Sequence, residues 1–336
     1  MLQSDMKLNR KKLVGIITVI EILAIIGIGF YMYKRWEAAK YVLSKVVVTP
    51  ISKNVLLDEP TSELKYFYEL TPNNSWSDEP SWLGYKAVYT INTDTLNERY
   101  DYQLKKQDGV FRIITLGDSF TFGQYVSTAD NWSEVLEDSL NRLNCKGIKK
   151  FEVINLGVPG YDVEYIAQRY AIRGEKYNPD LIIWLESGSG FNRINELRVP
   201  YEQKIAQTLT QQEIANAQKQ GDYWLAWTKA DGEVFKNYTG SQIAEIIGRA
   251  WQKFFLSRGD TKVLVATFPY VTTEQLKQLN FWFQGQKNVS IFNDLPDVRL
   301  SNLHVADGHP SIEGHQMIAE SILNYLKNSS IISCSP

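Results

Sequence analysis

Five short apolar segments, separated by helical patterns, constrain the fold of this chain more than any other feature. Each is rich in Ile and Val and apolar on both faces, as expected of strands covered on both sides. The segments are 112–116, 151–155, 181–185, 262–267 and 289–292. Because they alternate with helical stretches, the sequence predicts an α/β fold in which a parallel sheet has helices on both faces.

Helical patterns fill the intervals between these segments. After the first segment, apolar residues recur at helical spacing from Trp132 to Leu143. A last helix is predicted to begin near Ser311, directly after Pro310, and to bury Ile318, Ile322 and Tyr325. An insert over about 200–238 is helical and polar, and since it follows the third strand we expect it to form a lid or a wall over a site.

The chain divides into five regions by composition. They are a tail (1–12), a membrane span (13–33), a linker and small β-containing lead-in (34–107), a catalytic domain (108–328) and a C-terminal tail (329–336). In the lead-in, 66–68 and 85–91 are predicted strands on either side of a Pro/Asn/Ser/Trp-rich loop, 71–82. We expect the lead-in to pack on the main domain and to carry no second catalytic unit.

An apolar run of 21 residues, Leu13–Tyr33, is long enough to cross a bilayer. A cleaved signal peptide is the alternative, but its apolar region is shorter and a small-residue cleavage site follows it. Here aromatic and basic residues follow instead, as at a membrane interface. The sequence therefore predicts an uncleaved single-pass anchor.

The orientation of this span rests on its basic flanks. Lysine and arginine are equally frequent on the two sides, but Arg10, Lys11 and Lys12 form the tighter cluster. This favours a cytoplasmic N-terminus and an extracytoplasmic catalytic domain. Glu21 lies mid-span, where a charge is costly; it is either protonated or paired within its own helix, or it contacts a partner membrane helix.

A serine follows the first predicted strand in a tight turn, Gly117-Asp118-Ser119. Open α/β sheets place their chemistry at this carboxyl edge. A serine hydroxyl needs a general base and an orienting carboxylate to act as a nucleophile. Taken alone, Ser119 has a helix N-cap in a tight turn as its alternative explanation.

The required base and carboxylate occur together near the C-terminus, in Asp307-Gly308-His309. Histidine can accept the serine proton near neutral pH, and a carboxylate two residues earlier can fix its tautomer. The competing histidines are His304, on the approach to this segment, and His315, which is one turn into the last helix and is expected to pack or cap there.

Two further loops offer donors for an oxyanion. The second strand runs into Asn155-Leu156-Gly157, where a glycine lets the backbone N–H approach a substrate oxygen. The third strand runs into a loop containing Asn192, whose amide can supply another donor. A plain turn glycine and a solvated loop asparagine are the alternatives.

At these four places the sequence resembles the SGNH/GDSL hydrolase family, over roughly residues 108–327. The resemblance implies a three-layer α/β/α sandwich with a five-stranded parallel sheet, of flavodoxin-like type. It also implies Ser119 as nucleophile, His309 as base and Asp307 as its orienting carboxylate. The oxyanion donors would be the Ser119 and Gly157 N–H groups and the Asn192 amide.

The sequence departs from the family pattern in two ways. The family usually spaces its carboxylate and histidine as Asp-x-x-His, whereas this chain has Asp-x-His, a spacing similar to that of alginate O-acetyltransferase-like relatives. The asparagine block usually reads Gly-x-Asn-Asp close to the strand end. Here Asn192 lies further along the loop, Arg193 replaces the usual Asp, and Asn195 is a rival for the amide.

Composition excludes several other classes. With 36 basic and 38 acidic residues the net charge is −2, so we expect no nucleic-acid partner. Three histidines and two cysteines without metal-ligand spacing predict no metal site, and we expect no cofactor. Cys145 and Cys334 can pair in an oxidising compartment. We expect Cys334 to lie in a mobile Ser-rich tail, so the sequence does not predict the disulfide.

The resemblance and the predicted span together imply a membrane-anchored serine esterase that forms an acyl-Ser119 intermediate. Its expected substrate is an acylated carbohydrate or another ester, with deacetylation of a cell-surface or exported polysaccharide as the first expectation. The alternatives are an O-acyltransferase acting on a polysaccharide and a non-catalytic carbohydrate-binding or assembly subunit with the same fold.

Overall fold

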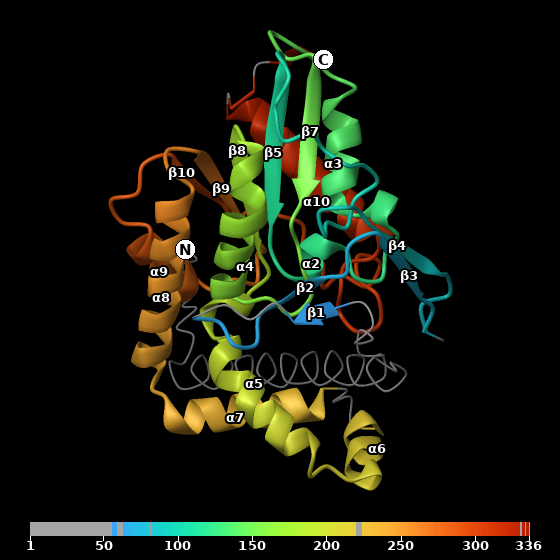
Figure 1. Cartoon of the computed structure of the whole chain (residues 1–336), viewed down its shortest axis with the longest axis vertical. Helices are drawn as coiled ribbons and strands as arrows, with labels where there is room; N and C mark the ends of the chain where they lie inside the picture. Colours follow the sequence, from blue (N-terminus) through green and yellow to red (C-terminus); the bar gives the residue numbers. More distant parts are fainter. Residues whose placement is uncertain are drawn as a thin grey trace, which may run out of the picture.

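A five-stranded parallel sheet forms the centre of the protein (Figure 1). The computed structural model describes residues 56–58, 63–80, 82–219, 224–329, 331–332 and 334–335. The sheet comprises β5 (Val110–Leu116), β7 (Lys150–Asn155), β8 (Leu181–Glu186), β9 (Lys262–Thr267) and β10 (Val289–Phe292). Its order is β10-β9-β8-β5-β7, and every neighbouring pair is parallel. The predicted α/β fold with five parallel strands is confirmed.

Helices cover both faces of this sheet (Figure 1). One face carries α4 (Val163–Arg169), α8 (Gly240–Ser257) and α9 (Thr273–Trp282), and the other carries α3 (Trp132–Leu140) and α10 (Ile312–Asn328). Strand β8 shows why its sequence is apolar throughout. Its Trp184 packs on Trp251 of α8 with ring centroids 4.1 Å apart, while the neighbouring Ile183 belongs to the core of the opposite face.

The polar insert after β8 is helical, as its sequence predicts. It forms α5 (Asn195–Ala206), α6 (Gln211–Lys219) and α7 (Leu225–Asn237). Figure 1 shows these helices beyond the end of the sheet toward which the strand arrows point. They therefore lie on the carboxyl side of the strands, where chemistry is expected.

The N-terminal segment forms two small antiparallel pairs. Strand β1 (Leu56–Asp58) pairs with β2 (Tyr68–Leu70), and β3 (Asn74–Asp78) pairs with β4 (Ala87–Ile91). The prediction that 71–82 is a loop is therefore wrong for residues 74–78. Trp76 of β3 packs on Tyr89 of β4, with ring centroids 4.9 Å apart, so a contact between the two strands compensates for the weak strand propensity of Asn and Ser.

A buried ion cluster holds this segment on the main domain. Glu69 of β2 is 2% exposed and pairs with Arg169 of α4 and with Arg173. A buried carboxylate is stable only when charge and hydrogen bonds compensate it, so these partners fix β2 against α4. The segment is thus part of the same packed unit as the sheet.

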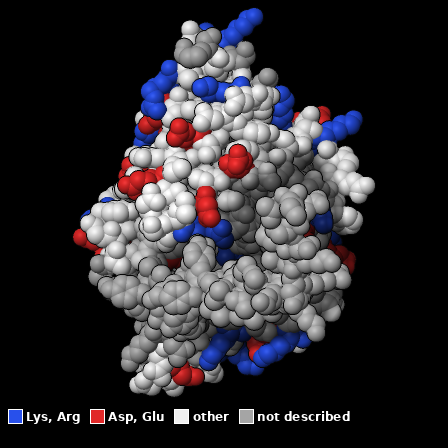
Figure 2. Space-filling view, turned by 180° about the vertical axis from the view of Figure 1, so that it is seen from behind, with Lys and Arg blue, Asp and Glu red and all other residues white. Residues whose placement is uncertain are grey.

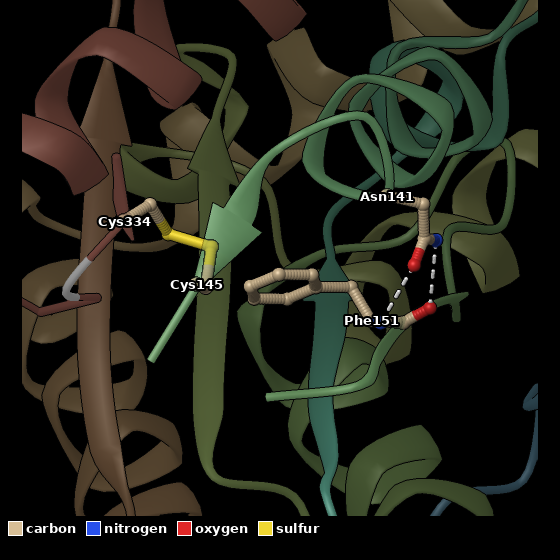
Figure 3. Close-up of a disulfide and its surroundings, with 4 residues drawn as sticks. All are labelled: Asn141, Cys145, Phe151 and Cys334. Carbon is tan, nitrogen blue, oxygen red and sulfur yellow. Dashed lines mark hydrogen bonds between the residues drawn. A yellow bond between two sulfur atoms is a disulfide. The ribbon is translucent and has the colours of Figure 1, made fainter. Parts of the chain in front are cut away.

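A disulfide joins Cys145 to Cys334 across a short antiparallel pair, β6 (Asn144–Cys145) with β11 (Cys334–Ser335). Figure 3 shows the Phe151 ring pointing toward the bond, and the Phe151 backbone is held by two hydrogen bonds to the Asn141 side chain. Ile332, just before Cys334, is 3% exposed. The disulfide, which the sequence does not predict, therefore holds Cys334 at β6 together with the strand pairing.

Within the described ranges, no helix is both long and apolar enough to cross a membrane. The predicted span 13–33, the tail 1–12 and Glu21 all lie outside the described residues, so the anchor, its orientation and a membrane-helix partner stay predictions. Figure 2 shows acidic and basic side chains on the same face of the molecule, as expected for a chain of net charge −2.

Candidate active site

The turn after β5 presents Ser119 at the carboxyl edge of the sheet. Asp118 caps the one-turn helix α2 (Ser119–Phe122), because its Oδ1 accepts a hydrogen bond from the Phe120 N–H at 3.1 Å. Gly117 is required by packing, since a Cβ there would lie 2.2 Å from the Thr121 Oγ1. The strand-to-helix turn can therefore be this tight only with glycine at 117.

Three side chains form a continuous hydrogen-bonded chain at this edge. The Ser119 Oγ lies 2.8 Å from the His309 Nε2, and the His309 Nδ1 lies 2.9 Å from the Asp307 Oδ2. The structure thus brings together the three residues that the sequence singled out, although Ser119 and His309 are 190 positions apart. This is the arrangement of a nucleophile, its base and an orienting carboxylate.

The short Asp-x-His spacing is accommodated by a tight turn. Gly308 adopts a left-handed backbone with φ of 95°, and its N–H donates to the Val305 carbonyl at 2.9 Å. As a result Asp307 contacts His309 twice, because its Oδ1 also accepts from the His309 backbone N–H at 3.1 Å. The carboxylate is therefore fixed relative to the imidazole that it orients.

The surroundings of His309 favour its protonated form. Burial by itself lowers the pKa of His309, but the adjacent Asp307 carboxylate outweighs it, and the pKa is raised above its ordinary value. Asp118 acts in the same direction. The imidazole is thus a stronger base than a free histidine.

The competing histidines lie elsewhere. His315 is fully buried in α10, and its Nδ1 accepts from the Trp132 N–H at 3.1 Å, so it caps the start of α3. Burial lowers the pKa of His315 to about 3. The His304 Nδ1 lies 2.8 Å from the Leu300 carbonyl oxygen, and the backbone of His304 forms an isolated antiparallel bridge with that of Pro310. Neither takes the place of His309.

Gly157 lies beneath the serine turn and does not line the cleft described below. A Cβ at Gly157 would lie 2.3 Å from the Phe122 N, so the glycine permits the end of β7 to pack against α2. Its N–H donates to the Asn155 Oδ1 at 2.8 Å. The prediction that this N–H faces substrate is therefore not supported by its position, because the amide is already used in the packing of the turn.

Asn192 is exposed and also does not line the cleft. Its rival Asn195 is buried, and its amide donates to the Gly160 carbonyl at 2.9 Å. The chain turns at Gly188, which has φ of 98°, into a short 3-10 helix, Ser189–Phe191. This turn directs Ser187, Ser189 and Arg193 toward the cleft instead.

Those three residues converge on Asp118. The Ser187 and Ser189 hydroxyls donate to the Asp118 Oδ2 at 2.7 and 3.0 Å, and the Arg193 Nη1 lies 3.6 Å from the same oxygen. Asp118 is therefore the link between the serine turn and the loop after β8. Sequence reasoning missed this role, because the serines and the arginine follow a different strand and carry no motif of their own.

Ser119 and His309 open into a cleft of about 640 Å³. Its far wall comes from the insert, through Trp224, Trp227, Thr228 and Asp231, and Tyr68 of β2 contributes from the N-terminal segment. The guanidinium of Arg198 lies 3.3 Å from the Trp227 ring centroid and holds that ring in place. The insert is thus a wall of the site, as its position in the sequence predicts.

No group of three or more His, Cys, Asp or Glu side chains is arranged to hold a metal ion within the part of the chain that the structure describes. The residues at the centre of the cleft are instead those of acid–base and nucleophilic chemistry.

Comparison with known proteins gives similarities of fold only. No family model and no curated protein matches the chain. A lipase/acylhydrolase from Enterococcus faecalis is 14% identical, with 67% of this chain and 99% of that chain covered and a TM-score of 0.41. An acetyl xylan esterase from the rumen bacterium Butyrivibrio proteoclasticus is 14% identical, with 68% and 66% covered and a TM-score of 0.41.

A family 3 carbohydrate esterase from Clostridium thermocellum is 18% identical, with 66% of this chain and 96% of that chain covered and a TM-score of 0.34. Because these three identities are below 25% and the TM-scores below 0.5, the similarities carry no inference about activity. What this chain can do follows instead from its own Ser119, His309 and Asp307.

Proposed function

We propose that the protein is an SGNH-type serine hydrolase that cleaves acyl esters. The observation that carries the proposal is the unbroken hydrogen-bonded chain from Ser119 through His309 to Asp307 at the base of an open cleft. The four sequence blocks that resemble this family support the same proposal.

In the proposed reaction, His309 accepts the Ser119 proton at Nε2 as the serine oxygen attacks the acyl carbonyl. The Ser119 N–H donates to the oxyanion that forms. Collapse of this intermediate breaks the ester C–O bond, and the departing alcohol takes the proton from His309. Water then repeats the sequence on the acyl-serine, which releases the carboxylic acid and restores the enzyme.

The proposed substrate is an O-acetylated polysaccharide at the cell surface or in export. Two tryptophans, Trp224 and Trp227, line the cleft and provide apolar rings suited to packing against a sugar. The Cys145–Cys334 disulfide supports a location outside the reducing cytoplasm. This agrees with the predicted anchor, which would place the cleft close to the membrane.

Transfer of the acetyl group to a sugar hydroxyl is the second candidate. Its first half-reaction is the same, and the Asp307-Gly308-His309 spacing, shared with alginate O-acetyltransferase-like relatives, is the observation that favours it. The acceptor in the second half-reaction, water or sugar, distinguishes the two.

Acetate release from an O-acetylated polysaccharide by the full-length protein tests the proposal. We expect Ser119-dependent release, and mass spectrometry after addition of an unacetylated oligosaccharide shows whether the group is transferred. Trp224→Ala should raise the KM for the polymer about tenfold and change that for p-nitrophenyl acetate much less. Binding of the polymer without cleavage of any ester would instead indicate a non-catalytic subunit.

The rate of ester cleavage should rise with pH through the titration of His309. The base must be neutral to accept a proton, and because the pKa of His309 is raised, the midpoint of the acidic limb of kcat/KM should lie above the ordinary value of about 6.5. Rates measured from about pH 5 to 9, on enzyme that is stable over that range, check this. A flat profile or a midpoint below 6.5 contradicts it.

A further inference from the structure

Tyr125, three residues after α2, has a backbone conformation that is unfavourable for a bulky residue. Its φ is 68°, in the left-handed region, where a bulky side chain costs about 1–2 kcal/mol. Among the residues that the structure describes, three of the other four non-glycine residues with positive φ are asparagines, which tolerate this region well. An aromatic residue persists there only if its surroundings hold it.

The N-terminal segment provides that support. The Tyr125 N–H donates to the Tyr89 hydroxyl at 2.7 Å, and the Tyr125 carbonyl accepts from the Tyr85 hydroxyl at 2.9 Å. The Tyr89 hydroxyl is itself fixed, because it donates to the Asp78 Oδ2 at 3.0 Å. Trp82 packs edge-on against the Tyr125 ring, with centroids 4.8 Å apart.

Held in this way, the Tyr125 ring lies against the base. It meets the His309 ring nearly at right angles, at 78° and 5.4 Å between centroids, while Phe120 approaches the imidazole at 5.3 Å. The two aromatic rings therefore restrict the plane of the imidazole.

The Tyr125 hydroxyl is also a neighbour of the Asp307 carboxylate. Tyr125 is 1% exposed and its hydroxyl has no partner at normal hydrogen-bond geometry. Burial raises the pKa of Tyr125, and the neighbouring Asp307 charge raises it further, so the phenol keeps its proton. The Asp307 side chain is only 3% exposed, and it accepts hydrogen bonds from the backbone N–H and the Nδ1 of His309. The buried Tyr125 hydroxyl, which has no partner at normal geometry, therefore has the Gln124 side chain and the buried Asp307 carboxylate as its neighbours, and the carboxylate can accept another hydrogen bond.

We propose that Tyr125 is a positioning residue of the active site, whose hydroxyl donates to Asp307 and whose ring orients His309, and that the segment 74–91 holds it there. The role in turnover rests on the proposed ester cleavage, whereas the contact with the Asp307–His309 pair does not. The N-terminal segment therefore contributes to the geometry of the active site through Tyr125.

Tyr125→Phe tests the proposal, because it removes the hydroxyl and keeps the ring. A hydrogen bond from Tyr125 spreads the Asp307 charge and weakens its attraction for the imidazolium, so its loss should raise the midpoint of the His309 titration by on the order of 0.5 pH unit. We expect kcat for p-nitrophenyl acetate to fall about tenfold with little change in KM.

Histidine labelled with ¹³C in the full-length protein measures the titration without any reference to activity. The chain has three histidines, so the spectrum is simple, and His304→Gln assigns His304. His315 should not titrate near neutrality, since burial lowers its pKa to about 3. A protein that cleaves no ester would defeat the proposed function, yet the titration would still report on Tyr125.

Tyr170→Phe is the matched control, because Tyr170 is equally buried but its ring packs on Phe254 of α8 and not on His309. It should leave the His309 titration unchanged. Tyr89→Phe removes the acceptor of the Tyr125 N–H and should shift the titration in the same direction as Tyr125→Phe. If Tyr125→Phe does not fold, Tyr89→Phe provides the test in its place. A His309 titration in the folded variant that coincides with wild type overturns the proposal.

Discussion

Replacing Ser119 with alanine should abolish ester cleavage, with a loss of kcat of about 10³-fold or more. Ser119 is the hydroxyl that lies against the His309 Nε2, at 2.8 Å, so the substitution removes the nucleophile itself. The fold should persist, because the substitution removes one half-buried hydroxyl from a turn whose cap is provided by Asp118. Turnover of p-nitrophenyl acetate and the thermal midpoint of the same samples measure the two effects.

The loss should be non-additive with that of the base. His309→Ala should reduce kcat by a similar factor, and the double variant should be no worse than the more damaging single variant, since the side chains act as one unit. His304→Ala is the control and should retain most of the activity. Unchanged turnover in Ser119→Ala, or inactivation by His304→Ala in place of His309→Ala, would contradict the assignment.

Removing the disulfide should produce the second large effect, on stability. The bond joins residues separated by 189 positions, and closing so long a loop restricts the unfolded chain strongly. The double variant Cys145→Ser, Cys334→Ser should lose about 3–5 kcal/mol of the free energy of unfolding. Denaturant unfolding, with and without a reductant, measures this loss.

The reductant provides an internal control for this prediction. It should destabilise the wild type and leave the double-serine variant unchanged. Activity at low temperature should survive, because Cys145 precedes β7 at the amino edge of the sheet, whereas Ser119 lies at the carboxyl edge. Equal unfolding midpoints for the two proteins under oxidising conditions would show that the bond does not form in solution.

The central sheet could be predicted from the sequence because the burial of each strand is reflected in the strand's own apolar residues. The sequence predicts Lys262–Thr267 at its observed bounds, since a strand covered on both faces is largely apolar, and it predicts the half-buried edge strand Val289–Phe292 at its observed bounds as well. The start of the last helix can also be predicted from the sequence. Ser311 is its N-cap, and the Ser311 hydroxyl accepts a hydrogen bond from the Gly314 N–H.

The residues at the centre of the site were predictable for a related reason. Ser119 directly follows a strand, and Asp307 is two positions from His309. Each group therefore lies in a short motif that can be recognised in the sequence. A serine nucleophile needs a base and a carboxylate, which pairs Ser119 with His309 and Asp307 across 190 positions, and the resemblance to a family supports this pairing.

What the sequence did not determine depends on contacts between distant segments. Asn74–Asp78 forms a strand because Trp76 packs on Tyr89 of the neighbouring strand. Cys334 is held in place because β11 pairs with β6. Gly157 packs beneath α2, and Asn192 is turned to solvent by the 3-10 helix before it. None of these outcomes is encoded in the neighbouring residues.

The same distinction separates the catalytic residues from those that surround them. The sequence by itself determined the α/β sheet and the three residues that meet at its edge, because periodicity and short motifs reflect local burial and local chemistry. Only the tertiary structure decided that Tyr68, Trp224 and Tyr125 border the site. Their positions depend on how the N-terminal segment and the insert dock, and docking is set by the summed burial of side chains far apart in the chain.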